Sequence, residues 1–230
     1  MEIDFTEYWF MEEFDILKSL TYNQKVDVIN MSCRTEFKCN DIIYDTNEKA
    51  NRLYFLKKGT VKVSKYSDCG KEMIVDILKV GDIFGEASVF GDGSGNYSEV
   101  VEIMEDALTC SLSINDVRQL LIENFDFSLA INELIGNKYK KIQYRLETLF
   151  FKKAPERIKS FIKEITDEYG KKLANNEEYE VKMKLTHNDI AKLTATTRQT
   201  VTTNMNKLVK NGVLIYDRNR ILIKKYDALS

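Results

Sequence analysis

The sequence predicts an α+β protein: a β-rich N-terminal domain of the barrel or jelly-roll type, a long helix, and a small C-terminal domain of helices and a hairpin. Three observations predict this fold. Turn residues separate short β-forming runs between residues 41 and 112, the apolar period then becomes that of a helix, and the C-terminal segment holds a helix pair and a hairpin. With 230 residues, 43% of them hydrophobic, the chain is long enough for two packed domains.

The β-rich region consists of the segments DIIYDT, RLYFLKK, TVKVSKY, EMIVDILK, EVVEIM and ALTCSLSI. Each is rich in β-branched and aromatic residues, and glycine-containing turn signals separate most of them. Their regular spacing is typical of a small β-barrel or jelly roll. A helical lead-in over residues 14–32 precedes them, and we place this domain at residues 1–125.

A long helical segment follows, from Ile114 to Phe151, and Gly136 is the one glycine or proline within it. Apolar residues recur in it at spacings of 4, 3, 4 and 3, as in a coiled-coil seam, although such a stripe could also pack on its own domain. We predict a dimerisation helix and hinge over residues 126–152, with Pro155 opening the next helix. The predicted dimer interface consists of Ile135, Tyr139, Ile142, Leu146 and Leu149.

Charge is divided unevenly along the chain. The net charge of the whole is -2, yet the segment from Lys184 onward has nine Lys or Arg residues and three Asp residues, a net charge of +6. A basic segment attached to an acidic body is typical of a nucleic-acid-binding domain. A solvated basic face is the alternative interpretation.

The C-terminal segment LTHNDIAKLTATTRQTVTTNMNKLVKNGVLI has the pattern of a helix-turn-helix. Thr186 and Asp189 form a capping-box pattern that opens the first helix, and a polar turn over residues 194–197 follows. The second helix begins near Arg198, and Gly212 ends it. Two strands around residues 217–219 would form a wing. We therefore predict a winged helix-turn-helix DNA-binding domain at residues 153–230, rather than a helical domain that binds protein.

The exposed face of the second helix has the chemistry to read bases. Arginine can bind guanine O6 and N7, glutamine can bind adenine N6 and N7, and threonine can contact a thymine methyl group or a phosphate. We therefore expect double-stranded DNA as a partner. The predicted base-reading residues are Arg198, Gln199, Thr202 and Thr203, and the predicted DNA-backbone contacts are Thr186, His187, Thr197, Asn206, Lys207, Arg218 and Arg220.

The runs LYFLKKGTVKV, GKEMIVDIL, GDIFGEASVF and TRQTV occur in register across both predicted domains. On these runs, from about Asp41 to the final strand, the chain resembles the CRP/FNR transcription factors, the family of the cyclic-AMP receptor protein and the fumarate and nitrate reduction regulator. The resemblance implies a cyclic-nucleotide-binding-type β-roll, a homodimer on a palindromic operator, control by an effector, and activation through RNA polymerase. Gln199 and Thr203 depart from the family's base-reading Glu and Arg, so we expect an altered half-site.

The resemblance also places an effector pocket in the β-roll. Gly85 and Glu86 match nucleotide-binding members, but Asn96 and Tyr97 stand where those members carry an Arg followed by Ser or Thr. Without that fixed positive charge, we expect an unidentified small-molecule effector or none, rather than cyclic AMP. Backbone amides of the 91–95 loop could still bind a different anion. The candidate pocket residues are Gly85, Glu86, Ala87, Ser88, Asn96, Tyr97, Ile142 and Gln143.

The sequence indicates no cofactor or metal. The one histidine, His187, lies outside the predicted sensor, so haem is not expected, and the four irregularly spaced cysteines predict neither an iron–sulfur cluster nor a disulfide scaffold. Cys33 and Cys39 could form a redox pair if the fold brings them together, but we expect buried, inert thiols.

Two other classes of protein account less well for the sequence. A cupin-type metal enzyme needs histidine ligands that the barrel lacks, so we do not expect an enzyme. A cyclic-nucleotide-binding regulatory subunit would leave the basic helix and wing without a purpose. The start, MEIDFTEYWFMEEF, is acidic and unlike a signal peptide, and no stretch is apolar enough to span a membrane. We therefore expect a cytoplasmic protein without a membrane partner.

Overall fold

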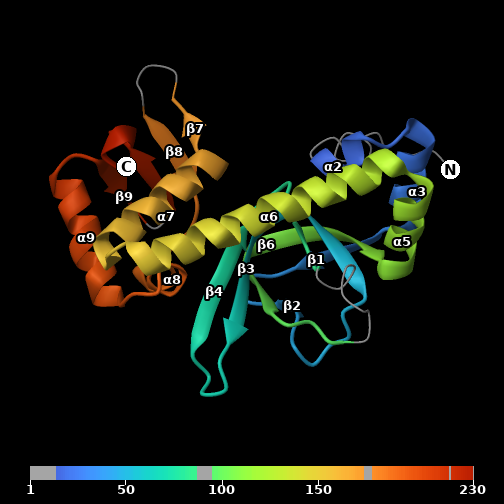
Figure 1. The fold of residues 1–230 in the computed structure, drawn as a ribbon, viewed down its shortest axis with the longest axis horizontal. Coiled ribbons are helices and arrows are strands. Elements are labelled where there is room, and N and C mark those ends of the chain that lie inside the picture. Colours follow the sequence, from blue (N-terminus) through green and yellow to red (C-terminus); the bar gives the residue numbers. More distant parts are fainter. Residues whose placement is uncertain (1–13, 87–94, 174–177, 218, 230) are drawn as a thin grey trace. The chain divides into compact units, whose positions relative to one another are not determined.

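The computed structural model describes residues 14–86, 95–173, 178–217 and 219–229 (Figure 1). The chain divides into two compact units. The N-terminal unit comprises residues 1–71 and 75–140, and the C-terminal unit comprises residues 72–74 and 141–230. The long helix α6 (Phe125–Phe151) contributes its first part to one unit and its last part to the other.

The N-terminal unit is built on a six-stranded sheet, as the alternating β-forming segments predicted. Four strands follow the order β1-β6-β3-β4, while β2 pairs with β6 and β5 pairs with β3. Two sets of buried side chains form the core, one of them between the sheet and the helices that contribute Phe14, Val117 and Phe127. The strands are β1 (Cys33–Phe37), β2 (Ile42–Tyr44), β3 (Arg52–Tyr66), β4 (Glu72–Leu78), β5 (Ile83–Phe84) and β6 (Val100–Ser113).

Strand boundaries differ from the prediction at several points, and the short strand β5 was not predicted. The predicted segments EVVEIM and ALTCSLSI form one strand, β6, and RLYFLKK and TVKVSKY form one strand, β3, because Gly59 makes a bulge instead of a turn. Its φ is +94°, the pairing register shifts around it, and an added Cβ would lie 2.7 Å from the Asp106 carbonyl oxygen. The sequence did not predict strand β1, CRTEF, which is mostly exposed and so lacks the apolar alternation that marks a half-buried strand.

The helices of this unit are α2 (Asp15–Lys18), α3 (Tyr22–Met31), α5 (Ile114–Glu123) and the first part of α6. The predicted helical segment 114–151 is interrupted at Asn124, whose backbone is extended with φ -133° and ψ 106°. Its side-chain oxygen accepts a 2.8 Å hydrogen bond from the Phe127 backbone N–H, as an N-cap does. A cap without glycine or proline therefore separates α5 from α6, and α6 begins one residue before the predicted start.

In the part of the C-terminal unit that the structure describes, three α-helices follow α6, and four strands form a sheet of order β7-β8-β10-β9. Pro155 lies in the first turn of α7, as predicted. The helix pair and the hairpin also follow the prediction, whereas the two strands before them were not predicted. The elements are α7 (Ala154–Tyr169), β7 (Lys171–Lys172), β8 (Tyr179–Lys182), α8 (His187–Leu193), α9 (Arg198–Lys210), β9 (Leu214–Tyr216), β10 (Arg220–Ile223) and the 3-10 turn η1 (Tyr226–Leu229).

All four cysteines are free thiols. Cys110 is buried in the core, but the expectation of buried thiols is wrong for the other three, which are exposed. Cys33 begins β1, Cys39 follows that strand, and Cys69 lies in the turn between β3 and β4, so none of the three faces the core. Among the described residues, no helix is long and apolar enough to cross a bilayer.

Candidate nucleic-acid interface

The first helix of the pair, α8, begins with the predicted capping box. The Thr186 hydroxyl accepts a 3.1 Å hydrogen bond from the Asp189 backbone N–H, and the Asp189 carboxylate accepts a 2.9 Å bond from the Thr186 backbone N–H. The hydroxyl also donates to the same carboxylate at 2.6 Å. This reciprocal cap satisfies two backbone donors at the start of α8 and fixes where the helix begins.

Arg157 of α7 binds the turn between α8 and α9 through two hydrogen bonds. Its guanidinium donates to the Thr194 carbonyl at 2.9 Å and to the Ala195 carbonyl at 2.9 Å. Ala195 has a φ of +48°, an uncommon conformation for a residue with a side chain. Sequence analysis missed Arg157, which lies 37 residues before the turn it holds.

Helix α9 is amphipathic in the predicted way. Val201, Met205 and Leu208 are buried. Its N-cap, Thr197, accepts a 3.1 Å hydrogen bond from the Thr200 backbone N–H. The opposite face presents the exposed polar residues Arg198, Gln199, Thr203, Asn206 and Lys207, while Thr202 is half-buried. Figure 1 shows α8 and α9 beside each other in the C-terminal unit.

His187 and Thr202 link the two helices. The His187 Nδ1 atom lies 2.9 Å from the Thr202 hydroxyl oxygen, which in turn donates to the Arg198 carbonyl at 2.9 Å. The imidazole also stacks on the Tyr216 ring, with centroids 5.2 Å apart. The hydroxyl predicted to read a base is therefore engaged inside the protein.

The predicted wing is the antiparallel β9–β10 hairpin. Asp217 accepts hydrogen bonds from the backbone N–H groups of Asn219 at 2.8 Å and Arg220 at 3.0 Å, which shapes the turn and, with Arg220, lowers the pKa of Asp217. The Arg220 side chain binds both Asp217 at 3.1 Å and Glu180 of β8 at 3.1 Å. Arg220 must share its charge with these carboxylates, and Arg218 lies outside the described residues.

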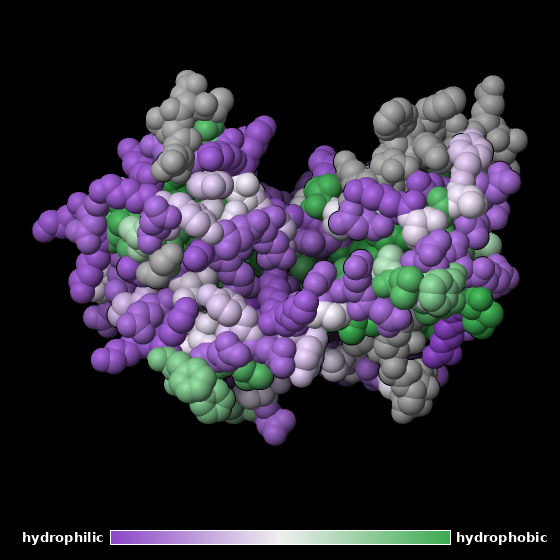
Figure 2. Space-filling view, turned by 45° about the horizontal axis from the view of Figure 1, so that its top comes forward, coloured by the Kyte–Doolittle hydropathy of each residue, from purple (hydrophilic) through white to green (hydrophobic). Residues whose placement is uncertain are grey.

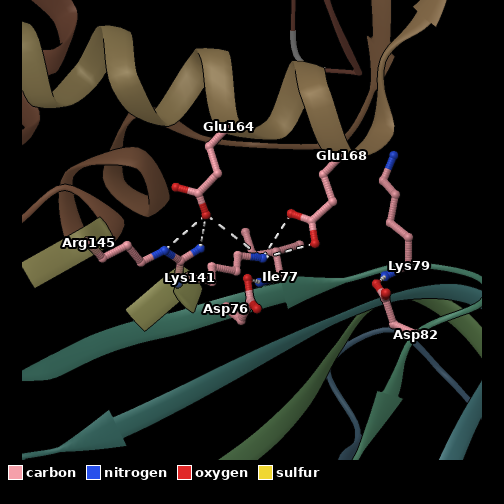
Figure 3. Close-up of polar contacts among 8 residues, drawn as sticks. All are labelled: Asp76, Ile77, Lys79, Asp82, Lys141, Arg145, Glu164 and Glu168. Atoms are coloured by element: carbon pink, nitrogen blue, oxygen red, sulfur yellow. Dashed lines mark hydrogen bonds and ion pairs between the residues drawn. The ribbon is translucent and has the colours of Figure 1, made fainter. Parts of the chain in front are cut away.

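An ion-pair network joins the end of α6 to α7 (Figure 3). Arg145 binds the Glu164 carboxylate at 2.7 and 3.0 Å, and Lys141 binds Glu168 at 2.8 Å and approaches Glu164 at 3.8 Å. All four side chains are at least partly shielded from solvent, and shared pairs of this kind hold geometry better than an isolated surface pair. The network therefore links the last part of α6 to α7 within the C-terminal unit.

The predicted dimer seam lies on the solvent side of α6. Tyr139, Ile142, Leu146 and Leu149 are 61%, 53%, 50% and 42% exposed, whereas Ile135 is half-buried. Figure 2 shows that, on the face in view, apolar residues gather in separate patches within a mostly hydrophilic surface. A run of exposed apolar residues along one helix is costly in water and marks an interaction surface.

The predicted effector pocket contains a charge pair that the sequence did not reveal. Lys138 of α6 donates to the Glu86 carboxylate at 2.6 Å and to the Ile83 carbonyl at 2.8 Å. Gly85 precedes this site with a φ of +81°, and an added Cβ would lie 2.7 Å from the Arg52 carbonyl oxygen. Glu86 is thus neutralised by a lysine of the protein itself.

Tyr97 fills the neighbouring part of the β-roll. It is buried, its ring stacks on Tyr44 with centroids 3.7 Å apart, and its hydroxyl donates to the Arg52 carbonyl at 3.2 Å. The Tyr44 hydroxyl donates to Glu99 at 3.0 Å, and burial raises the pKa of that carboxyl. Asn96 is exposed, and its side-chain amide donates to the Thr46 carbonyl at 3.0 Å.

The other predicted pocket residues are Ala87, Ser88, Ile142 and Gln143. Ala87 and Ser88 lie outside the described residues. Ile142 and Gln143 belong to the C-terminal unit, where both are exposed. The structure therefore groups Gly85, Glu86 and Tyr97 in the N-terminal unit, and it adds Lys138, Tyr44 and Glu99 to them. No local spacing signals the contact of Lys138 with Glu86, because the two residues are 52 positions apart.

Removal of the Arg157 guanidinium should weaken the C-terminal unit. We expect Arg157→Met to lower its free energy of unfolding by about 2 kcal/mol, because the hydrogen bonds from a charged donor to the Thr194, Ala195 and Lys152 carbonyls are lost. Arg157→Lys should recover only part of the lost free energy, since one ammonium cannot replace the hydrogen bonds that the guanidinium makes with several carbonyls at once. Denaturant unfolding followed by circular dichroism measures both, and equal stability of all three proteins would contradict the clamp.

Both domains of the chain match models of known protein domains. The cyclic nucleotide-binding domain model matches residues 34–124, and the Crp-like helix-turn-helix domain model matches residues 156–230. The global nitrogen regulator of a Nostoc species is 28% identical over 195 residues, covering 84% of this chain and 86% of its own. The CRP-like cAMP-activated global transcriptional regulator of Mycobacterium tuberculosis is 21% identical over 195 residues, covering 85% of each.

Among solved structures, that of a CooA mutant from Carboxydothermus hydrogenoformans matches with a TM-score of 0.73 at 25% identity, covering 88% of each chain. The two domain models, relatives matched over 84% and 85% of the chain, and a structure matched over 88% of it agree with the order of sheet, long helix and helix-turn-helix described above. The chain therefore belongs to the CRP/FNR family of DNA-binding transcription regulators.

Proposed function

We propose that this regulator is a homodimeric activator that binds a palindromic operator, contacts RNA polymerase, and responds to an effector other than a cyclic nucleotide. The observation that carries the proposal is the first turn of α9, where Arg198 and Gln199 are exposed while the apolar face of the helix is buried. The N-terminal turn of a recognition helix is the part that enters the major groove. Such a role places the protein in the cytoplasm with the DNA.

The exposed side chains suggest which bases are read. Arg198 can make the bidentate contact with guanine, and Gln199 can do the same with adenine. Thr203 is exposed but too short for a bidentate contact with guanine. We infer a half-site with one guanine read by Arg198 and with altered preference at the positions that other members read with Glu and Arg.

A two-fold dimer would bury the exposed seam of α6 and present two copies of α9 to successive major grooves. The spacing of the seam residues is that of a coiled coil, and four of the five are largely exposed in the single chain. Burial of these side chains against a second copy would stabilise the dimer by roughly 1–2 kcal/mol for each apolar residue.

The charge pattern of the β-roll argues against a cyclic nucleotide. Glu86 is already paired with Lys138, and Tyr97 occupies the position where nucleotide-binding members carry a small hydroxyl residue next to an arginine. A nucleotide would have to displace the lysine and would find no arginine for its phosphate. An uncharged metabolite, a different anion, or no small molecule at all fits these residues better.

Loss of the Arg198 side chain tests base reading. Once an operator has been selected from random DNA, Arg198→Ala should weaken binding about 10- to 100-fold and relax specificity at one base pair, because a bidentate contact discriminates by roughly 1–3 kcal/mol. Fluorescence anisotropy on single-base variants of the operator measures both effects, with Lys225→Ala as a matched loss of exposed charge. Equal weakening on every sequence would instead indicate a phosphate contact.

Charge placed in the seam tests the dimer. We expect Ile142→Glu combined with Leu146→Glu to convert the dimer to monomers, since unpaired carboxylates would be buried against each other. Operator affinity should then fall roughly 100-fold or more, because the two half-sites are bound independently. Light scattering gives the mass, and Lys140→Glu is the control on the same helix. A double variant that stays dimeric would rule out this seam.

Calorimetry tests the effector claim. We expect no binding heat from cyclic AMP or cyclic GMP at concentrations up to about 1 mM, the regime of about -4 kcal/mol or weaker. A cAMP-activated relative provides the positive control in the same buffer. Micromolar binding of either nucleotide would show that a ligand can displace Lys138 from Glu86, and it would overturn this part of the proposal.

A further inference from the structure

His187, the one histidine of the chain, lies among α8, α9 and β9. Its Nδ1 atom is 2.9 Å from the Thr202 hydroxyl oxygen on α9, and its ring stacks on Tyr216 of β9 at an interplanar angle of 21°. Sequence analysis treated His187 as a DNA-backbone contact. In the structure, both ring nitrogens are directed into the protein: Nδ1 meets Thr202, and Nε2 is buried.

Hydrogen-bond counting fixes the tautomer. A threonine hydroxyl has one hydrogen to donate, and that of Thr202 goes to the Arg198 carbonyl at 2.9 Å. The hydroxyl oxygen can then only accept from His187, so Nδ1 carries the proton. The other tautomer would lose one of these two bonds and would leave a buried Nε2–H without an acceptor.

The Nε2 atom is buried and, among the described residues, has no hydrogen-bond partner. A proton added there would create a cation with no acceptor, close to the Arg198 guanidinium on α9. Burial first and Arg198 second lower the pKa of His187. The other titratable groups around it are Tyr216 on β9, whose pKa is raised by burial, and Asp189 on α8, which is engaged in the capping box. The site therefore favours the neutral imidazole.

We propose that neutral His187 is a positioning residue of the DNA interface: its Nδ1–H holds the Thr202 hydroxyl, which holds the carbonyl of Arg198 at the start of the recognition helix. The inference rests on DNA reading by α9. It also changes the role of Thr202, whose hydroxyl has no hydrogen left to donate to a base. Thr202 can then contribute its methyl group, which suits the thymine C5-methyl.

The two roles of His187 predict opposite pH dependence. A group whose pKa is lowered by folding stabilises the folded state above its ordinary pKa, and this stabilisation is lost as the pH falls through the lowered value. Acidification should therefore disturb the start of α9 and weaken operator binding. A histidine that contacts phosphate would gain charge on acidification and bind DNA more tightly.

Asparagine and glutamine substitutions test the roles of the two ring nitrogens of His187 separately. An asparagine amide nitrogen can take the place of Nδ1, whereas a glutamine amide reaches the place of Nε2. Operator affinity of the full-length protein would be measured from about pH 8 to about pH 5.5 at constant ionic strength. We expect wild-type affinity to fall about 5- to 10-fold over this range. His187→Asn should match the wild type at the upper end and stay flat, while His187→Gln and His187→Ala should already be about 5- to 10-fold weaker there.

Two results would overturn the proposal. One is wild-type affinity that rises on acidification, together with a salt dependence whose slope falls by about one in His187→Ala, since this is the signature of a phosphate contact. The other is that His187→Asn, His187→Gln and His187→Ala all match the wild type in operator affinity over the whole pH range. Thermal unfolding shows whether each variant is folded, and the asparagine variant decides the matter if the alanine variant is not. Failure of Arg198→Ala to alter specificity would count against the proposed base reading instead.

Discussion

Burial of one face of α9 is the constraint on which the interface depends. Val201, Met205 and Leu208 are directed into the C-terminal unit, so the other side of the same helix must face solvent. Every polar group offered to DNA by α9 is placed by this apolar stripe, and the stripe itself carries no sequence information for DNA. The clamp of Arg157 on the preceding turn then sets where the helix begins.

Several charged side chains of this protein link its secondary-structure elements through ion pairs. Lys138 binds Glu86 within the N-terminal unit, and Arg145 binds Glu164 at the junction of α6 and α7. Both cations come from the long helix. Because each pair is partly shielded from solvent, removal of one partner would leave the other charge partly buried without a counter-charge. Each unit therefore holds its own part of α6 through an ion pair.

Local patterns were predictable, and contacts between distant residues were not. The capping box of Thr186, the apolar stripe of α9 and the seam of α6 each depend on spacings of three or four residues, so the sequence alone reveals them. Arg157 and Lys138 act on residues 37 and 52 positions away, and no local spacing signals such pairs. Strand β1 was missed because it is mostly exposed, and the break at Asn124 because asparagine caps a helix without glycine or proline.

Hydrogen-bond satisfaction narrows the set of residues that can specify a base. The hydroxyls of Thr186, Thr197 and Thr202 are engaged in caps or with backbone carbonyls, and Arg220 is shared by two carboxylates. The Thr186 and Thr202 hydroxyls would have to give up an existing acceptor to donate to DNA, which cancels much of the gain, and two carboxylates already offset the charge of Arg220. The exposed residues Arg198 and Gln199 lie in the first turn of α9 and bear the multi-donor groups suited to base edges. Discrimination between operators should therefore be concentrated in these two residues, and whatever positions the first turn of α9 also sets the specificity.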